Sequence, residues 1–245
     1  MMILLMLIWV GASVIVSQLA VGHLLLAIIG PQNFSQPVWT AVYSAISYVL
    51  AMCLVIFVPK IIILKKKKTA LDKNTPKQDR VQLGLRDLPT WTDIGLAPVG
   101  FIIYLVIAAG LTALFNLFPW FNAEETQNLA FETYLVGFDR IVAFATLVVV
   151  APIAEEIIFR GWLYGKIRER LSSKIPEVWS LIISIFLVSL VFGIVHLQWN
   201  VGVNVFAMSI VLCGLREITG TIYAGMLLHM LKNGVAFYLL YVLGM

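Results

Sequence analysis

Apolar residues follow one another along this chain in seven long stretches, and polar residues gather in the segments between them. An apolar helix of roughly 17–25 residues is long enough to cross the hydrocarbon core of a bilayer. The predicted spanning segments are 3–29, 38–63, 95–118, 138–162, 178–197, 201–217 and 220–243. The pattern therefore predicts an all-α integral membrane protein, built as a polytopic bundle of about seven transmembrane helices.

The composition excludes a water-soluble globular domain. Hydrophobic residues make up 61% of the 245 residues, and charged residues only 12%. A soluble domain carries about 45–50% apolar and about 25% charged residues, so this chain has too little polar surface to face water on all sides. The net charge of +4 does not indicate a nucleic-acid partner, because the basic residues gather at predicted membrane edges.

The basic residues also predict topology and domain organisation. Of the 17 basic residues, nine lie between Lys60 and Arg86 and four between Lys166 and Lys174. Cytoplasmic loops concentrate Lys and Arg, so both clusters are predicted to be cytoplasmic. The chain then divides into a two-helix transmembrane hairpin, a basic cytoplasmic loop and a transmembrane core, over residues 1–64, 65–94 and 95–245. The surrounding partner is the lipid bilayer.

Three charged residues lie inside the fourth predicted span, at Glu155, Glu156 and Arg160. Each charge at a helix centre costs roughly 2.5–3.5 kcal/mol on insertion scales, and ionisable groups in a span usually mark function. Glu156 and Arg160 are four residues apart, so they share a helix face and can form an ion pair. Glu155 lies about 100° round the helix from Glu156. It is therefore predicted to face a cavity or a group from another helix.

Two later spans carry further polar side chains at helical spacing. Phe192 and His196 are one turn apart, and His229 and Asn233 are again four residues apart, so each pair projects on one helix face. A carboxylate can take a proton from water with help from an imidazole. A His and an Asn side chain can donate hydrogen bonds to an oxyanion. These side-chain types therefore favour an intramembrane hydrolytic active site, with Phe192 packing beside it.

The same residues resemble the signature of a known family. The three motifs are Glu155-Glu156-x-x-x-Arg160, Phe192-x-x-x-His196 and His229-x-x-x-Asn233. Together they resemble the CPBP family, which includes type II CAAX prenyl proteases and Abi-type bacterial proteins for bacteriocin processing or immunity. Each motif alone is weak, but three motifs in this order, each in a separate span, are specific.

The resemblance implies an intramembrane glutamate-type endopeptidase that cleaves a peptide bond of a membrane-associated peptide or protein. Glu155 and His196 would activate the attacking water, and His229 and Asn233 would form the oxyanion site. The compact chain looks more like the bacterial members, which implies a multi-pass protein of the bacterial cell membrane. Processing of peptide pheromones or bacteriocins, or self-immunity, are its candidate roles. The oligomeric state is open.

The resemblance also implies supporting roles for Glu156, Arg160 and Phe192, and it leaves the metal question open. Two histidines and one glutamate could in principle bind zinc. The chain has no His-Glu-x-x-His motif of zinc peptidases. The prediction is therefore an enzyme without a metal or other cofactor, with zinc as the alternative that is not favoured.

Two other classes of function stay open. Buried Glu and His residues also build proton relays, so a proton-coupled transporter is one alternative. Transporters often carry inverted repeats with broken helices, and the sequence shows no internal repeat. A non-catalytic membrane scaffold that regulates a partner is the second alternative, and the complete motifs argue against it.

Overall fold

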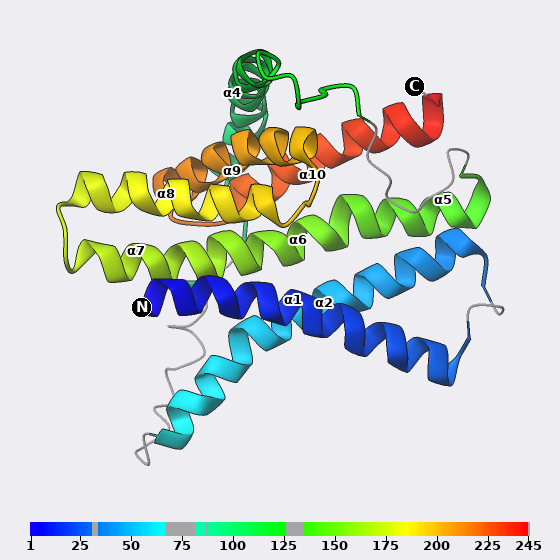
Figure 1. The fold of residues 1–245 in the computed structure, drawn as a ribbon, viewed down its shortest axis with the longest axis horizontal. Coiled ribbons are helices and arrows are strands. Elements are labelled where there is room, and N and C mark those ends of the chain that lie inside the picture. Colours follow the sequence, from blue (N-terminus) through cyan, green and yellow to red (C-terminus); the bar gives the residue numbers. More distant parts are fainter. Residues whose placement is uncertain (31–33, 67–81, 87, 126–134, 245) are drawn as a thin grey trace. The chain divides into compact units, whose positions relative to one another are not determined.

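The computed structural model describes residues 1–30, 34–66, 82–86, 88–125 and 135–244. Its α-helices are α1 (Met2–Ile28), α2 (Gln36–Lys66), α4 (Trp91–Phe115), α5 (Gly137–Phe144), α6 (Ala151–Glu156), α7 (Gly165–Ser172), α8 (Glu177–Ile194), α9 (Trp199–Thr219) and α10 (Tyr223–Tyr238) (Figure 1). The π-helical segments η2 (Ala145–Val150), η3 (Ile157–Tyr164) and η4 (Leu239–Leu243) continue α5, α6 and α10. These residues contain no strand, which confirms the predicted all-α fold.

Seven helices of the described chain are long and apolar enough to cross a membrane, which confirms the predicted multi-pass class. They run over Met2–Ile28, Gln36–Ile62, Trp91–Phe115, Gly137–Ser172, Glu177–Ile194, Trp199–Thr219 and Tyr223–Leu243. Large apolar side chains stay exposed along them, as at Ile8 and Ile15 of α1 and Val106 of α4. Such extended apolar surface marks a membrane-facing exterior.

The fourth spanning helix is longer than the apolar pattern predicts, because it continues to Ser172 and does not end at residue 162. The second basic cluster therefore lies largely on α7 and not in a loop. Lys and Arg are good helix formers. Arg168 is also held by hydrogen bonds to Glu177 and Glu217, which fix the end of this helix to α8 and α9.

The start of α4 also differs from the prediction, since the helix begins at Trp91 and not at residue 95. Thr90 and Asp93 form a capping box, in which each side chain binds the other residue's backbone N–H. Residues 67–81, half of the predicted basic loop 65–94, lie outside the described residues. The predicted division into hairpin, loop and core stays a prediction.

The chain forms two compact units. The first contains Met1–Leu71, Asn128–Ile158 and His229–Met245, and the second contains Asp72–Gln127 and Phe159–Leu228. The unit boundaries fall inside helices, between Ile158 and Phe159 and between Leu228 and His229. Each of these two helices therefore gives one part to each unit.

In the first unit, α1 and α2 pack against each other along a face of α1 that includes the buried Ser13 and Ser17. Small residues let membrane helices approach closely. Two hydrogen bonds tie the helix that starts with α5 to the α2 region: Ser35 donates to Asp139 over 2.9 Å, and Thr146 donates to the Ala41 carbonyl over 3.4 Å.

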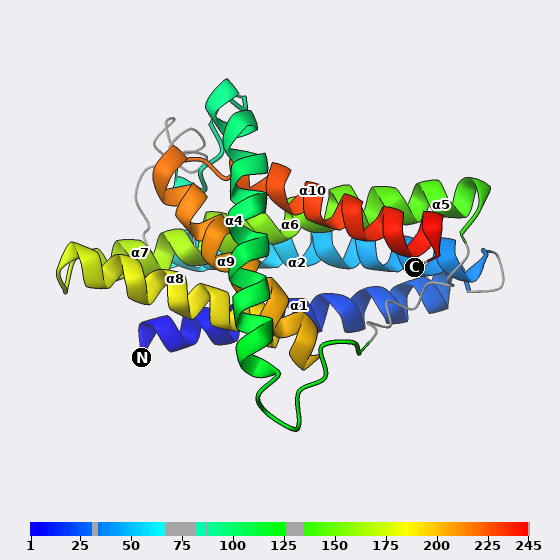
Figure 2. The same ribbon diagram turned by 90° about the horizontal axis from the view of Figure 1, so that it is seen from above.

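In the second unit, α8 and α4 both pack on α9, and Figure 2 shows α4 lying obliquely across α9. A side chain on Gly193 of α8 would bring its Cβ within 2.9 Å of the Gly202 carbonyl oxygen of α9. Only glycine permits this approach of the two backbones. Tyr104 of α4 donates a 2.6 Å hydrogen bond to Asn204 of α9, and this bond fixes the crossing.

Candidate active site

The two glutamates of the first motif lie at the end of α6, a short α-helical stretch between the π-helical segments η2 and η3. π-Helical turns widen a helix locally and often occur at functional sites. The Glu156 side chain is fully buried, whereas 13% of the Glu155 side chain is exposed. Glu155 therefore keeps part of its side chain exposed, whereas Glu156 is enclosed by protein.

His229 of α10 lies between these two carboxylates. Its Nδ1 is 3.1 Å from Oε1 of Glu156, a hydrogen bond, and its Nε2 is 3.7 Å from Oε2 of Glu155. A carboxylate in its ionised form only accepts hydrogen bonds, so towards such a carboxylate Nδ1 is the donor. The buried Glu156 thereby fixes the orientation of the ring and turns Nε2 towards Glu155.

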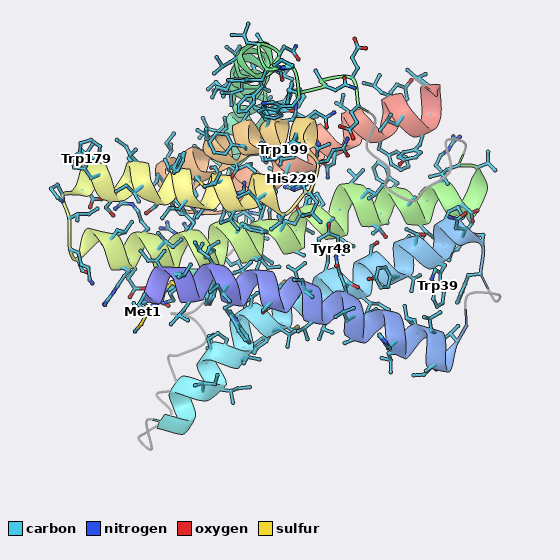
Figure 3. All side chains as sticks on the ribbon, in the orientation of Figure 1. Met1, Trp39, Tyr48, Trp179, Trp199 and His229 are labelled. Atoms are coloured by element: carbon cyan, nitrogen blue, oxygen red, sulfur yellow. The ribbon has the colours of Figure 1, made fainter. Side chains whose placement is uncertain are left out.

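Glu155 also meets a residue that the motif analysis did not select. The Tyr48 hydroxyl of α2 donates a hydrogen bond to its carboxylate, and Figure 3 labels Tyr48 and His229 on α2 and α10. The Lys232 ammonium group is close enough to attract the same carboxylate. The expectation that Glu155 meets groups from other helices is therefore met by side chains of α2 and α10.

Asn233 has a partner that follows from the local helix geometry. Its Nδ2 donates to the Leu147 carbonyl of η2 over 2.9 Å. In a π-helix the donor for a carbonyl is the N–H five residues later, and five residues after Leu147 stands Pro152. Proline has no backbone N–H. Pro152 thus leaves the Leu147 carbonyl open to the Asn233 amide.

His196 lies in the second unit, in the turn after α8 and not within the helix as expected. Its Nδ1 is 2.8 Å from the Phe192 carbonyl oxygen. A carbonyl oxygen only accepts, so Nδ1 carries a proton, and in the neutral form of the ring Nε2 is then an acceptor. The next residue, Leu197, has a φ of 57°, an uncommon conformation for a residue with a side chain.

Phe192 contacts the two other motif residues of the second unit, Arg160 and His196. The Arg160 guanidinium carbon lies 4.3 Å from the centre of the Phe192 ring, and both side chains are fully buried. The Phe192 and His196 ring centres are 5.1 Å apart in an edge arrangement. Phe192 therefore packs between a cation and a candidate catalytic imidazole.

The structure thus brings together four of the predicted residues in the first unit, namely Glu155, Glu156, His229 and Asn233, and three in the second, namely Arg160, Phe192 and His196. The Glu156–Arg160 ion pair and the joint action of Glu155 with His196 stay predictions. Among the described residues, no group of three or more His, Cys, Asp and Glu side chains is placed to hold a metal ion.

Residues 137–235 match a family model described as type II CAAX prenyl endopeptidase Rce1-like. No curated protein and no solved structure matches the chain significantly. The matched segment contains all seven residues of the three motifs. The resemblance to the CPBP family is confirmed, and over residues 137–235 this membrane protein is similar to the CAAX-protease-like intramembrane endopeptidases.

Proposed function

We propose that this protein is a glutamate-type intramembrane endopeptidase that hydrolyses a peptide bond of a membrane-associated peptide or protein. The observation that carries the proposal is the arrangement around Glu155. A partly exposed carboxylate lies inside a spanning helix, next to an imidazole that a second, fully buried carboxylate holds. The family match supports a peptide hydrolase in general.

Glu155 acts as the general base. It removes a proton from water, and the hydroxide formed attacks the carbonyl carbon of the peptide bond. The carbon–nitrogen bond then breaks, and the amine leaves with the proton that Glu155 returns to it. His196 helps to orient the water, because its Nδ1–H is bound to the Phe192 carbonyl and Nε2 of the neutral ring can accept a hydrogen bond from that water.

The oxyanion that forms during attack is stabilised by His229 and Asn233. The Asn233 amide has two protons. One binds the Leu147 carbonyl, and the second donates to the oxyanion. Glu156 holds the His229 ring through Nδ1. In the proposed mechanism this ring, which lies beside two carboxylates, acts as the imidazolium, so that Nε2 also carries a proton and donates it in a hydrogen bond to the oxyanion. Arg160 and Phe192 are fully buried in the second unit, and their proposed role is structural support.

The proposed substrate is a peptide that reaches the bilayer, because the candidate base lies within a spanning helix. A secreted peptide pheromone, a bacteriocin precursor or a protein with a lipid-modified C-terminus fits this description. The proposed location is the cytoplasmic membrane of a bacterium, and the proposed physiological role is peptide processing or self-immunity.

The test is mass spectrometry of secreted and membrane-bound peptides from cells that carry either the wild type or Glu155→Gln. We expect at least one peptide to be cut in wild-type cells and to accumulate uncut with the variant. Glu124→Gln, which changes an exposed glutamate outside the spans, is the matched control and should behave as the wild type. Identical peptide sets for all three proteins would contradict the proposal and favour a transporter or a scaffold.

Activity is also expected to survive removal of metal ions. The general base and the hydrogen-bond donors of the proposed mechanism all come from the chain. The purified protein should therefore keep its cleavage rate after treatment with a strong chelator, while a zinc peptidase treated in parallel loses its own. Loss of cleavage that added zinc restores would instead make Glu155, His196 and His229 metal ligands.

A further inference from the structure

Tyr48 brings a hydroxyl from the N-terminal part of the chain to the candidate general base. The family match begins at residue 137, and none of the three motifs includes α2. Tyr48 nevertheless donates a hydrogen bond to the Glu155 carboxylate. The two helices belong to the same compact unit and pack against each other.

The sequence of α2 explains why Tyr48 points at α6. Ala41, Tyr48 and Val55 are spaced by seven residues, close to two helical turns, so they lie on one face of α2. Ala41 and Val55 are both 0% exposed, which shows that this face is covered. The Thr146 hydroxyl of η2 binds the Ala41 carbonyl. The covered face is therefore the one turned towards the helix that carries Glu155.

We infer that Tyr48 is a positioning residue for Glu155, an inference that rests on the proposed function. A glutamate side chain has several rotamers, and only some would aim its carboxylate at a bound water. A hydrogen bond to an ionised acceptor is short and strong, so Tyr48 holds one carboxylate oxygen and leaves the other for the water. The N-terminal hairpin thus contributes to the reaction by fixing the position of the general base, Glu155.

Steady-state kinetics of Tyr48→Phe tests the inference. The change removes one oxygen atom and keeps the ring that packs on α6. We expect kcat to fall about tenfold with KM nearly unchanged, because misplacing a reacting group by about 1 Å can cost 10²-fold in rate. The matched control is Tyr43→Phe on the same helix, whose hydroxyl binds the Gln18 carbonyl of α1 over 3.2 Å. This control should keep the wild-type kcat.

A double-mutant cycle in thermal unfolding tests the contact without any substrate. Tyr48→Phe should lower the unfolding midpoint by about 4 °C. Its effect should largely vanish in a Glu155→Ala background, where the acceptor is already gone. Glu155→Leu can replace Glu155→Ala should the alanine protein not fold.

The two measurements separate failure of the inference from failure of the proposed function. Equal effects of Tyr48→Phe in both backgrounds would overturn the inference even for an active peptidase. Clear coupling together with wild-type kcat for Tyr48→Phe would overturn it as well. A wild type that cleaves no peptide while the coupling persists would contradict the proposed function and leave the Tyr48–Glu155 contact supported.

Discussion

Glu155→Gln is expected to lower kcat by about 10⁴, the upper end of what a general base contributes. The variant should fold as the wild type does, since glutamine has almost the same shape as glutamate. Its amide oxygen can still accept the hydrogen bond from Tyr48 that the carboxylate accepts. What the variant cannot do is take a proton from water. The measurement is steady-state cleavage of one defined peptide, with folding checked by thermal unfolding of the same sample.

Asn233→Ala provides the graded comparison for this experiment. Removing one oxyanion donor typically costs about 10²–10³ in kcat, so a small residual activity should persist. KM should change little, because the contact strengthens only in the transition state. An Asn233→Ala protein with wild-type kcat, or one less active than Glu155→Gln, would require the two roles to be reassigned.

The spanning helices follow from the sequence because a bilayer imposes one simple requirement. Some 20 consecutive apolar residues must satisfy their backbone hydrogen bonds within the helix, and this run is visible without any knowledge of packing. Helix ends are decided by local contacts that hydropathy does not contain. The capping box of Thr90 and Asp93 and the hydrogen bonds of Arg168 set two ends that the apolar pattern misplaces.

The motif residues of the site could be selected from the sequence because charge inside a span is costly. Their hydrogen-bond partners were harder to predict. Helical spacing predicts that His229 and Asn233 share a face, and the structure shows that they bind different groups, Glu156 and the Leu147 carbonyl. The second contact depends on Pro152 standing five residues after Leu147 in a π-helical turn. Pro152 was the sequence signal for this contact. In an α-helix, however, the N–H that Pro152 lacks would have bound the carbonyl four residues earlier, which is not that of Leu147.

Tyr48 was missed for another reason. A tyrosine in an apolar span usually indicates packing or a membrane interface, and its hydroxyl gives no sign of what it meets. The seven-residue spacing of Ala41, Tyr48 and Val55 shows that the three residues share a helix face. It does not show which helix covers that face. The packing of α2 against α6 supplies this information.

Arg160→Ala is expected to cost about 3–5 kcal/mol of folding free energy, the usual range for removing one partner of a buried ion pair. Arg160 is 0% exposed, and its guanidinium group stacks on the Phe192 ring. The predicted ion-pair partner is Glu156, which is also 0% exposed. Chemical unfolding in detergent measures the loss. Arg170→Ala, an exposed arginine on the continuation of the same helix, should change stability by less than about 0.5 kcal/mol.

Two further variants divide this loss into charge and stacking. Arg160→Lys keeps the positive charge but loses the planar guanidinium group that stacks on the Phe192 ring, so it should be destabilised, though by less than Arg160→Ala. The double variant Arg160→Ala with Glu156→Gln removes both charges, and it should be less destabilised than the sum of the two single changes. Additive losses would show that Glu156 is not the partner of Arg160. Wild-type stability of Arg160→Ala would contradict a structural role for this arginine altogether.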